Sequence, residues 1–248
     1  MPRRNGKRGR DPEASRMRLL EAGVKVFADR GPDGASVSMI AKEAHINRRM
    51  LYHYFDSKEG LYRAAIRHVY EQLSSTEIAL ADILLPAEEL LARLIRAYYD
   101  FLASHPQHVR LLTWENLRQG RSAREADLSS FKTPVIEALR IALDRGRREG
   151  RFRADVDEKQ LLISCLALSF FYFSNQYTVG QALGFNLASK RAMNERVRHV
   201  VNLLLDGIRT RQAVDKHGIP SGEWRSVNER RRSRARTTNG KRLDRITG

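Results

Sequence analysis

The sequence predicts an all-α protein, and three observations support this fold class. Apolar residues recur at the three- and four-residue spacing of helices along much of the 248-residue chain. The long central region shows no alternation typical of strands. Pro86, Pro106 and Pro134 divide it into stretches of about 15–25 residues, the length of ordinary helices. A chain of this length buries a substantial core, as one large domain or two smaller ones.

Two helices are expected near the N-terminus. Asp11 and Pro12 form a helix start, because an acidic cap precedes a proline at the first helical position. The helical spacing that follows is interrupted at the sequence DRGPDG, which begins with Asp29. Ser36 then caps a short second helix, whose apolar residues keep helical spacing up to Ala44.

A tight turn at residues 45–47 leads to a third and a fourth helix. Asn47 caps the third helix, which is expected to run through Tyr54. The sequence FDSKEG stops that helix and caps a long fourth one, from Ser57 to about Ala81. The segment across this junction, NRRMLYHYFDSKEGLY, combines adjacent arginines with several tyrosine hydroxyls, which is unusual for a short helix that only packs on a core.

Caps and loops also place the last long helices. The sequence GRREGRFRADVD is expected to be a loop, and Asp157 caps a helix that contains the apolar run 161–173. The sequence TVGQALGFNLAS, residues 178–189, is expected to be a second loop. A final helix from Ser189 to about Arg211 then carries a regular apolar face, which closes the fold.

The charge balance points to a polyanionic partner. The chain has 45 basic and 29 acidic residues, a net charge of +16, and the cations gather toward its two ends. Nucleic acid and an anionic membrane are the two obvious partners. The apolar run 161–173 is too short to span a bilayer, and the N-terminus lacks an apolar signal core. We therefore expect a cytoplasmic protein without a membrane partner.

The sequence contains no catalytic, metal-binding or cofactor-binding signature. None of its seven histidines belongs to an HExxH motif, and the single Cys165 rules out an intrachain disulfide and a cysteine-rich metal site. Neither a GxxxxGK[ST] loop nor a GxSxG motif is present. We expect no catalytic residue, no metal and no cofactor.

Two short helices joined by a tight turn, with cations at the start of the second, describe a helix-turn-helix. The second helix of this motif enters the DNA major groove with its N-terminal residues facing base edges. Arginine binds guanine O6 and N7 through two parallel hydrogen bonds, the commonest specific base contact. The predicted base contacts are Asn47, Arg48, Arg49 and Met50.

Residues around this helix are expected to hold the DNA backbone. Lys58 lies in the first turn of the fourth helix, where a cation opposes the helix dipole. A phosphate bound by this lysine and the free amides of the helix start would turn that cost into a binding site. Tyrosine hydroxyls one turn into the third helix can reach other phosphates. The predicted phosphate contacts are Ser36, Ser38, Tyr52, His53, Tyr54 and Lys58.

Residues 13–62 resemble the DNA-binding domain of the tetracycline-repressor (TetR) family of transcriptional regulators. The resemblance runs from LLEAGVKVFADRG through SVSMIAKEAHINRRMLYHYFDSKEGLY, with caps, turns, aromatics and lysine in the same order. His45 departs from the pattern, because the family usually has glycine in this turn. A left-handed backbone there would be strained for histidine, although less than for most residues.

The resemblance implies a DNA-binding domain followed by a larger helical domain that senses a ligand and forms a homodimer through its last two long helices. The apolar content of these helices also exceeds one buried stripe. The expected domains are a basic flexible arm (1–12), the helix-turn-helix domain (13–62), the ligand-binding and dimerisation domain (63–215) and a basic disordered tail (216–248).

The implied function is that of a sequence-specific regulator, most often a repressor, which a small-molecule effector releases from a palindromic double-stranded DNA operator. We expect a largely apolar effector. The candidate pocket residues are Tyr98, Trp114, Glu115, Asn116, Phe171 and Asn175, since aromatic walls and embedded polar groups are typical of ligand sites.

Two other functions remain open at this point. A ligand-independent architectural protein would coat DNA without sequence preference, and footprinting would separate it from a regulator that protects a palindrome. A peripheral membrane protein would need a basic amphipathic helix with exposed aromatic residues. The basic tail offers only Trp224 for that purpose.

Overall fold

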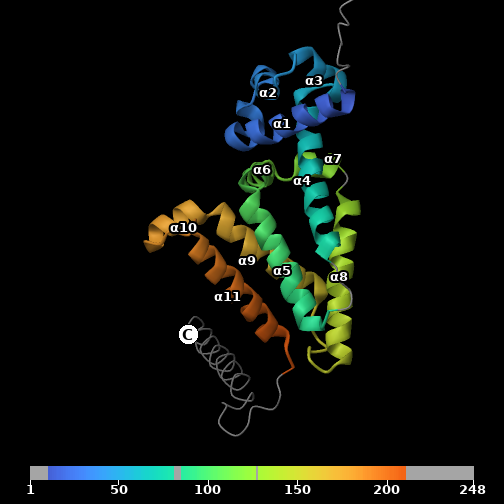
Figure 1. Cartoon of the computed structure of the whole chain (residues 1–248), viewed down its shortest axis with the longest axis vertical. Helices are drawn as coiled ribbons and strands as arrows, with labels where there is room; N and C mark the ends of the chain where they lie inside the picture. The colour runs from blue at the N-terminus through green and yellow to red at the C-terminus, as the bar shows by residue number, and fades with distance from the viewer. Residues whose placement is uncertain (1–10, 81–84, 127, 211–248) are drawn as a thin grey trace, which may run out of the picture. The chain divides into compact units, whose positions relative to one another are not determined.

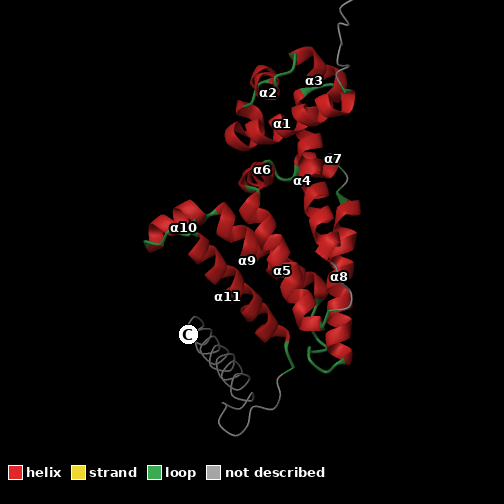
Figure 2. Cartoon of the chain, viewed as in Figure 1, coloured by secondary structure: helices red, strands yellow, loops and turns green. Residues whose placement is uncertain are grey.

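The computed structural model describes residues 11–80, 85–126 and 128–210, and it confirms the all-α fold class (Figures 1 and 2). Most of the predicted arm and all of the predicted tail lie outside these residues. Within them, the only β-pairing is an isolated antiparallel bridge between Phe152 and Arg209. The helices are α1 (Pro12–Gly34), α2 (Val37–Ala44), α3 (Arg48–Phe55), α4 (Lys58–Leu80), α5 (Ala87–Ser104), α6 (Pro106–Leu117), α7 (Arg121–Glu125), α8 (Ser129–Arg148), α9 (Glu158–Ser174), α10 (Gln176–Leu183) and α11 (Lys190–Ile208).

Helices α1 to α3 and the first half of α4 share one apolar core. Phe27 of α1, Ile40 of α2 and Leu51 of α3 are fully buried in it, and the rings of Phe27 and Tyr62 meet edge to face at 5.0 Å. Burial of these side chains is the main force that holds the short helices α2 and α3, which are too short to be stable alone.

The predicted caps of these helices are confirmed. The hydroxyl of Ser36 accepts a hydrogen bond from the Met39 amide at 3.2 Å, and Oδ1 of Asn47 accepts one from the Arg49 amide at 2.9 Å. The hydroxyl of Ser57 likewise accepts from the Gly60 amide at 2.9 Å at the start of α4. Each bond satisfies a backbone donor that the first helical turn leaves free.

Two backbone positions shape the connections around α2. Gly31 has φ 71° and kinks α1 within the sequence DRGPDG, so the helical backbone resumes after the kink and ends at Gly34. His45 ends α2 in the left-handed region, with φ 52° and ψ 41°. The backbone that the family builds with glycine is therefore also adopted here by histidine.

Helices α5, α8, α9 and α11 form a second apolar core. Leu143 of α8 and Val200 of α11 are fully buried, next to Leu91 of α5 and Leu161 of α9. Oδ1 of Asp157 accepts hydrogen bonds from the amides of Lys159 and Gln160, both at 2.9 Å, so the predicted cap of α9 is confirmed.

Two expectations about this region are wrong. Residues 178–189 are not a loop throughout, because α10 continues to Leu183 and ends at Gly184, which has φ 70°. Glycine at position 180 lets the chain fold back on α10, since a Cβ there would lie 2.8 Å from the Phe185 carbonyl oxygen. Pro134 lies inside α8 rather than between helices. It is the sixth residue of α8, so the helix lacks the one backbone hydrogen bond that an amide at this position would donate.

The end of α11 is joined to the connection between α8 and α9. Beside the Phe152–Arg209 bridge, the Thr210 amide donates to the Arg151 carbonyl at 2.7 Å. The Arg209 guanidinium also binds the Glu88 carboxylate of α5 at 2.6 Å. None of the helices in the described residues is long and apolar enough to cross a membrane.

Candidate nucleic-acid interface and apolar cavity

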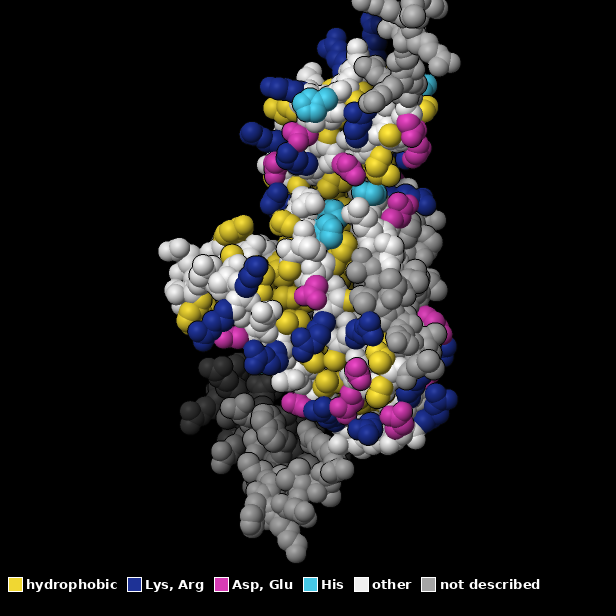
Figure 3. All heavy atoms as spheres, viewed as in Figure 1, with side chains coloured by type: hydrophobic (Ala, Val, Ile, Leu, Met, Phe, Trp, Pro, Cys, Tyr) yellow, Lys and Arg dark blue, Asp and Glu magenta, His cyan; other side chains and the backbone are white. Residues whose placement is uncertain are grey.

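Helix α3 presents its polar face to solvent because its apolar face is fixed in the core. Leu51 is fully buried and Phe55 nearly so, which turns Arg48, Arg49 and Tyr52 outward. Tyr52 is 52% exposed. Figure 3 shows many Lys and Arg side chains on the surface over α1–α3, with a few acidic side chains among them. This surface can approach a polyanion, and the first turn of α3 presents two adjacent exposed arginines on it.

The predicted base contacts differ in how freely they can reach a partner. Arg48 and Arg49 are exposed, and Asn47 is exposed while its Oδ1 caps α3. Met50 is half-buried and packs against the core of α1–α4. To contact a base, the Met50 side chain would therefore have to reach the DNA while it remains packed against the core.

The predicted phosphate contacts surround this turn. Ser38 and His53 are exposed, and Ser36 is exposed while its hydroxyl caps α2. Tyr54 is half-buried, with its ring 5.0 Å from that of His53. The structure thus gathers these residues on α2, α3 and the turn between them.

Lys58 has a structural partner that the sequence did not indicate. Its Nζ donates hydrogen bonds to the carbonyl oxygens of Pro32 at 2.8 Å and Ala35 at 3.1 Å. The ammonium group thereby joins the end of α1 to the start of α4. Free backbone amides at the start of α4 were expected to bind a phosphate beside Lys58. One of them, the Gly60 amide, is not free, because it donates a hydrogen bond to the Ser57 hydroxyl.

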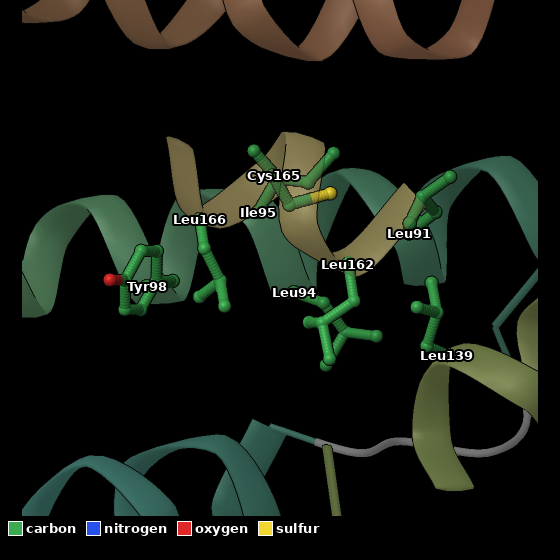
Figure 4. A pocket seen from close by; sticks show the side chains of 8 residues that line it. All are labelled: Leu91, Leu94, Ile95, Tyr98, Leu139, Leu162, Cys165 and Leu166. Atoms are coloured by element: carbon green, nitrogen blue, oxygen red, sulfur yellow. The ribbon is translucent and has the colours of Figure 1, made fainter. Parts of the chain in front are cut away.

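A small, partly open apolar cavity of about 30 Å³ lies between α5, α8 and α9 (Figure 4). None of the described residues that line it carries a charged side chain. Burial raises the pKa of the Cys165 thiol to about 12, so the thiol is neutral at physiological pH. The lining residues are Leu91, Leu94, Ile95, Tyr98, Leu139, Leu162, Cys165 and Leu166.

The structure does not bring the six predicted pocket residues together. Tyr98 alone lines the apolar cavity. Trp114, Glu115 and Asn116 belong to α6, whereas Phe171 ends α9 and Asn175 follows it. The lining leucines were missed because, in sequence, they are indistinguishable from core leucines.

Trp114 and Glu115 instead hold α6 against its neighbours. Nε1 of Trp114 donates to the Ala28 carbonyl of α1 at 3.3 Å. Glu115 is only 3% exposed, and its Oε1 accepts a hydrogen bond from the Ala123 amide at 2.8 Å. Burial and the nearby Glu115 carboxylate raise the pKa of Tyr62 on α4. These contacts connect α6 to α1, α4 and α7.

The described residues contain no group of three or more His, Cys, Asp or Glu side chains placed to hold a metal ion.

Two family comparisons cover most of the chain. Residues 19–65 match the bacterial regulatory proteins of the tetR family. Residues 86–204 match the tetracyclin repressor-like C-terminal domain. The two matches correspond to the helix-turn-helix region and to the region that contains the apolar cavity.

Curated relatives agree with this division. The HTH-type transcriptional repressor NicS of Pseudomonas putida is 32% identical over 208 residues, which cover 84% of this chain and 98% of NicS. The HTH-type transcriptional repressor SCO4008 of Streptomyces coelicolor is 33% identical over 140 residues, which cover 55% of this chain and 69% of that protein.

Solved structures share the fold. The putative transcriptional regulator SCO4942 of Streptomyces coelicolor has a TM-score of 0.60 at 23% identity, covering 78% of this chain and 98% of that one. The regulator FadR of Bacillus subtilis, solved in complex with stearoyl-CoA, has a TM-score of 0.61 at 22% identity, covering 77% and 98%. With NicS matched over nearly its whole length, this chain belongs to the tetR family of bacterial regulatory proteins.

Proposed function

We propose that this protein is a transcriptional repressor that binds a palindromic operator as a homodimer and leaves it when a small molecule enters and widens the apolar cavity. The observation that carries this proposal is the exposed arginine pair at the start of α3, in a helix whose other face is buried. We assign residues 13–62 to DNA binding and residues 63–215 to effector binding and dimerisation. The function requires no catalytic step and takes place in the cytoplasm.

In this proposal, the exposed arginines read base edges and the surrounding hydroxyls fix the register on the backbone. Arg48 and Arg49 are the main base contacts, and Asn47 and Met50 contribute beside them. The exposed side chains of Ser38, Tyr52 and His53 bind phosphates, supported by residues that also serve the fold. Those residues are Ser36, Tyr54 and Lys58.

The cavity lining indicates the chemistry of the effector. Its eight residues present alkyl groups, one phenol and one neutral thiol, without a cation or a carboxylate. Burying a charged group there would cost several kcal/mol in lost hydration. The effector is therefore uncharged and largely apolar. The relative FadR was solved with stearoyl-CoA, but the lining here offers no cation for a phosphate.

The dimer forms through α9 and α11. Ile163 and Phe171 lie two turns apart on α9 and are each 55% exposed, and Leu203 on α11 is 49% exposed. Large apolar side chains exposed on adjacent long helices are typical of an interaction surface. A two-fold interface of this kind places two copies of α3 on a symmetric DNA site.

Selection from a random DNA pool, followed by footprinting, tests DNA recognition. We expect an inverted repeat with protected half-sites about 34–36 Å apart, or a multiple of that distance. Similar affinity for every sequence would support the architectural alternative instead.

A cavity-filling variant tests the effector site. Leu162→Phe should keep operator binding but lose release by uncharged apolar compounds, because the added ring occupies the cavity. Leu117→Phe is the matched control, since Leu117 is 70% exposed on α6 and does not line the cavity. Fluorescence anisotropy of labelled operator, measured with apolar compounds and their carboxylated analogues, reports release. Equal release by charged analogues would contradict the assigned effector class.

A further inference from the structure

Three histidines lie around a groove between α1, α4 and the start of α6, and we refer to His68, His105 and His108 as the histidine cluster. The rings of His105 and His108 stack, with centroids 4.8 Å apart and planes 17° apart. The Phe101 ring lies 4.5 Å from His105 and 5.4 Å from His108. The cluster therefore combines His68 of α4, His108 of α6 and His105 between α5 and α6, beside α1 and at the contact between the DNA-binding helices and the rest of the fold.

His108 is poorly placed to carry a charge. It is only 3% exposed, and its Nδ1 has no hydrogen-bond partner among the described residues. Burial, followed by the nearby His105 and His68, lowers the pKa of His108 to about 4. Burial also lowers the pKa of His68, which Glu71 and Glu21 partly oppose and Arg16 reinforces.

The charged groups that face the cluster offer little compensation, because many are already paired. On α1, Lys25 binds Glu43 at 2.5 Å and Asp29 binds Arg110 of α6 at 2.9 Å. On α4, Arg67 binds Glu71 at 2.9 Å. Arg16 of α1 also binds Glu13, at 3.6 Å. The remaining charged groups around the cluster are Glu21 of α1, and Arg93, Arg96 and Asp100 of α5, which line a recess beside His105.

The same helices make the contacts that seat α6. Arg110 and Trp114 of α6 bind Asp29 and the Ala28 carbonyl of α1. The His108 side chain is buried nearly two turns before Trp114 on the same helix, so α6 cannot expose His108 without disturbing these contacts. Proton uptake by the cluster is therefore coupled to the packing of α6 against α1. We call α6 seated when these contacts are intact and unseated when they are broken.

We propose that the histidine cluster makes the seating of α6 on α1 and α4 sensitive to protons, so that acidification unseats α6 and weakens operator binding. This inference rests on the proposed repressor function. It adds a second input, independent of the effector in the apolar cavity, because the groove and the cavity share no lining residue.

The sign follows from the two protonation states. An exposed histidine has a pKa of 6.5, and His108 in the seated form has a pKa of about 4. Between these values the unseated form binds more protons, so the seated form is fully favoured above pH 6.5 and loses favour as the pH falls toward 4. Between pH 7.5 and 5 the equilibrium should shift by roughly 30-fold toward the unseated form.

Trp114 reports seating without DNA. In the full-length chain carrying Trp224→Phe, it is the only tryptophan. Its emission should shift to the red between pH 7.5 and 5, and the affinity for the selected operator at fixed salt should fall over the same range.

Substitutions at His108 test whether this residue causes the two pH effects. His108→Phe keeps an aromatic ring in the stack but cannot bind a proton, and it should remove both pH effects. His108→Gln should do the same if the phenylalanine variant does not fold. His45→Asn is the control, because it removes an exposed histidine and asparagine tolerates left-handed backbone.

Three results would overturn the inference: a pH-independent Trp114 emission, an emission change that survives both His108 substitutions, or an emission change without loss of operator affinity. Absence of sequence-specific DNA binding at every pH would contradict the proposed function instead. The Trp114 measurement would still show whether α6 is unseated by protons.

Discussion

The DNA-binding helices and the helices around the apolar cavity use apolar side chains in opposite ways. In α3, Leu51 and Phe55 fill the core completely, and the polar residues on the other face are free to contact a partner. Between α5 and α9, Leu94 and Leu162 leave space between them and line the cavity proposed to take the effector. The DNA-binding helices require a fully packed core, whereas the helices around the cavity require packing that leaves a space.

This difference predicts where substitutions are tolerated. A smaller side chain in the core of α1–α4 creates a new void, which removes contacts on every side. A smaller side chain at the cavity enlarges a space that already exists. The two regions should therefore respond differently to the same leucine-to-alanine change.

The largest effect is expected for Leu51→Ala, which should lower the free energy of unfolding by about 2–5 kcal/mol, because Leu51 is fully buried. Leu162→Ala should cost less than half as much, since Leu162 is half-buried beside the cavity. Chemical denaturation of both variants measures the comparison. Equal losses would show that the cavity wall is packed as tightly as the core.

Lys58→Ala should lower the free energy of unfolding by about 1.5–3 kcal/mol, the usual contribution of hydrogen bonds from a charged group. The substitution leaves the Pro32 and Ala35 carbonyls without their partner. Operator and random DNA should both be bound more weakly. If the melting temperature is unchanged while DNA binding falls, then Lys58 serves DNA rather than the fold.

Arg49→Ala should weaken operator binding by about 1–3 kcal/mol and relax specificity, while leaving stability nearly unchanged. The residue is exposed, and no core contact is lost. Binding to the selected operator and to random DNA, measured side by side, separates base reading from backbone contact. Equal losses for both DNAs would assign Arg49 to the backbone.

His45→Gly should be the smallest effect and the only favourable one, a gain in stability of about 0.5–1 kcal/mol. The backbone at this position is left-handed, which glycine adopts without steric cost. Thermal unfolding at neutral pH is the measurement. A loss of stability would mean that the imidazole makes a contact that offsets the strain.

The fold could be predicted from the sequence largely because helix caps are local. Ser36, Asn47 and Asp157 each bond to amides two or three residues ahead, so their role depends on short-range sequence alone. Helix α10 was missed because its glycine and polar residues are typical of loops, and its stability depends on a close approach between Gly180 and Phe185.

The exposed surface of α3 could also be predicted from the sequence, since its polar residues would not be expected in a core. The cavity could not be predicted in this way. Embedded polar groups favoured Glu115 and Asn116, yet Glu115 binds a backbone amide and Asn116 is exposed. Which leucines line a cavity depends on how α5, α8 and α9 pack together, and this packing cannot be predicted from a local sequence pattern.

The kink in α1 has an evolutionary consequence. A Cβ at Gly31 would lie 3.0 Å from the Trp114 ring, on a backbone that side chains rarely adopt. A lineage that acquires a larger residue at position 31 must therefore also displace the indole by a few tenths of an ångström or exchange it for a smaller side chain, and either change affects the bond to Ala28. The two positions should change together among descendants of this protein, as a pair inherited across the junction between its DNA-binding helices and the rest of the chain.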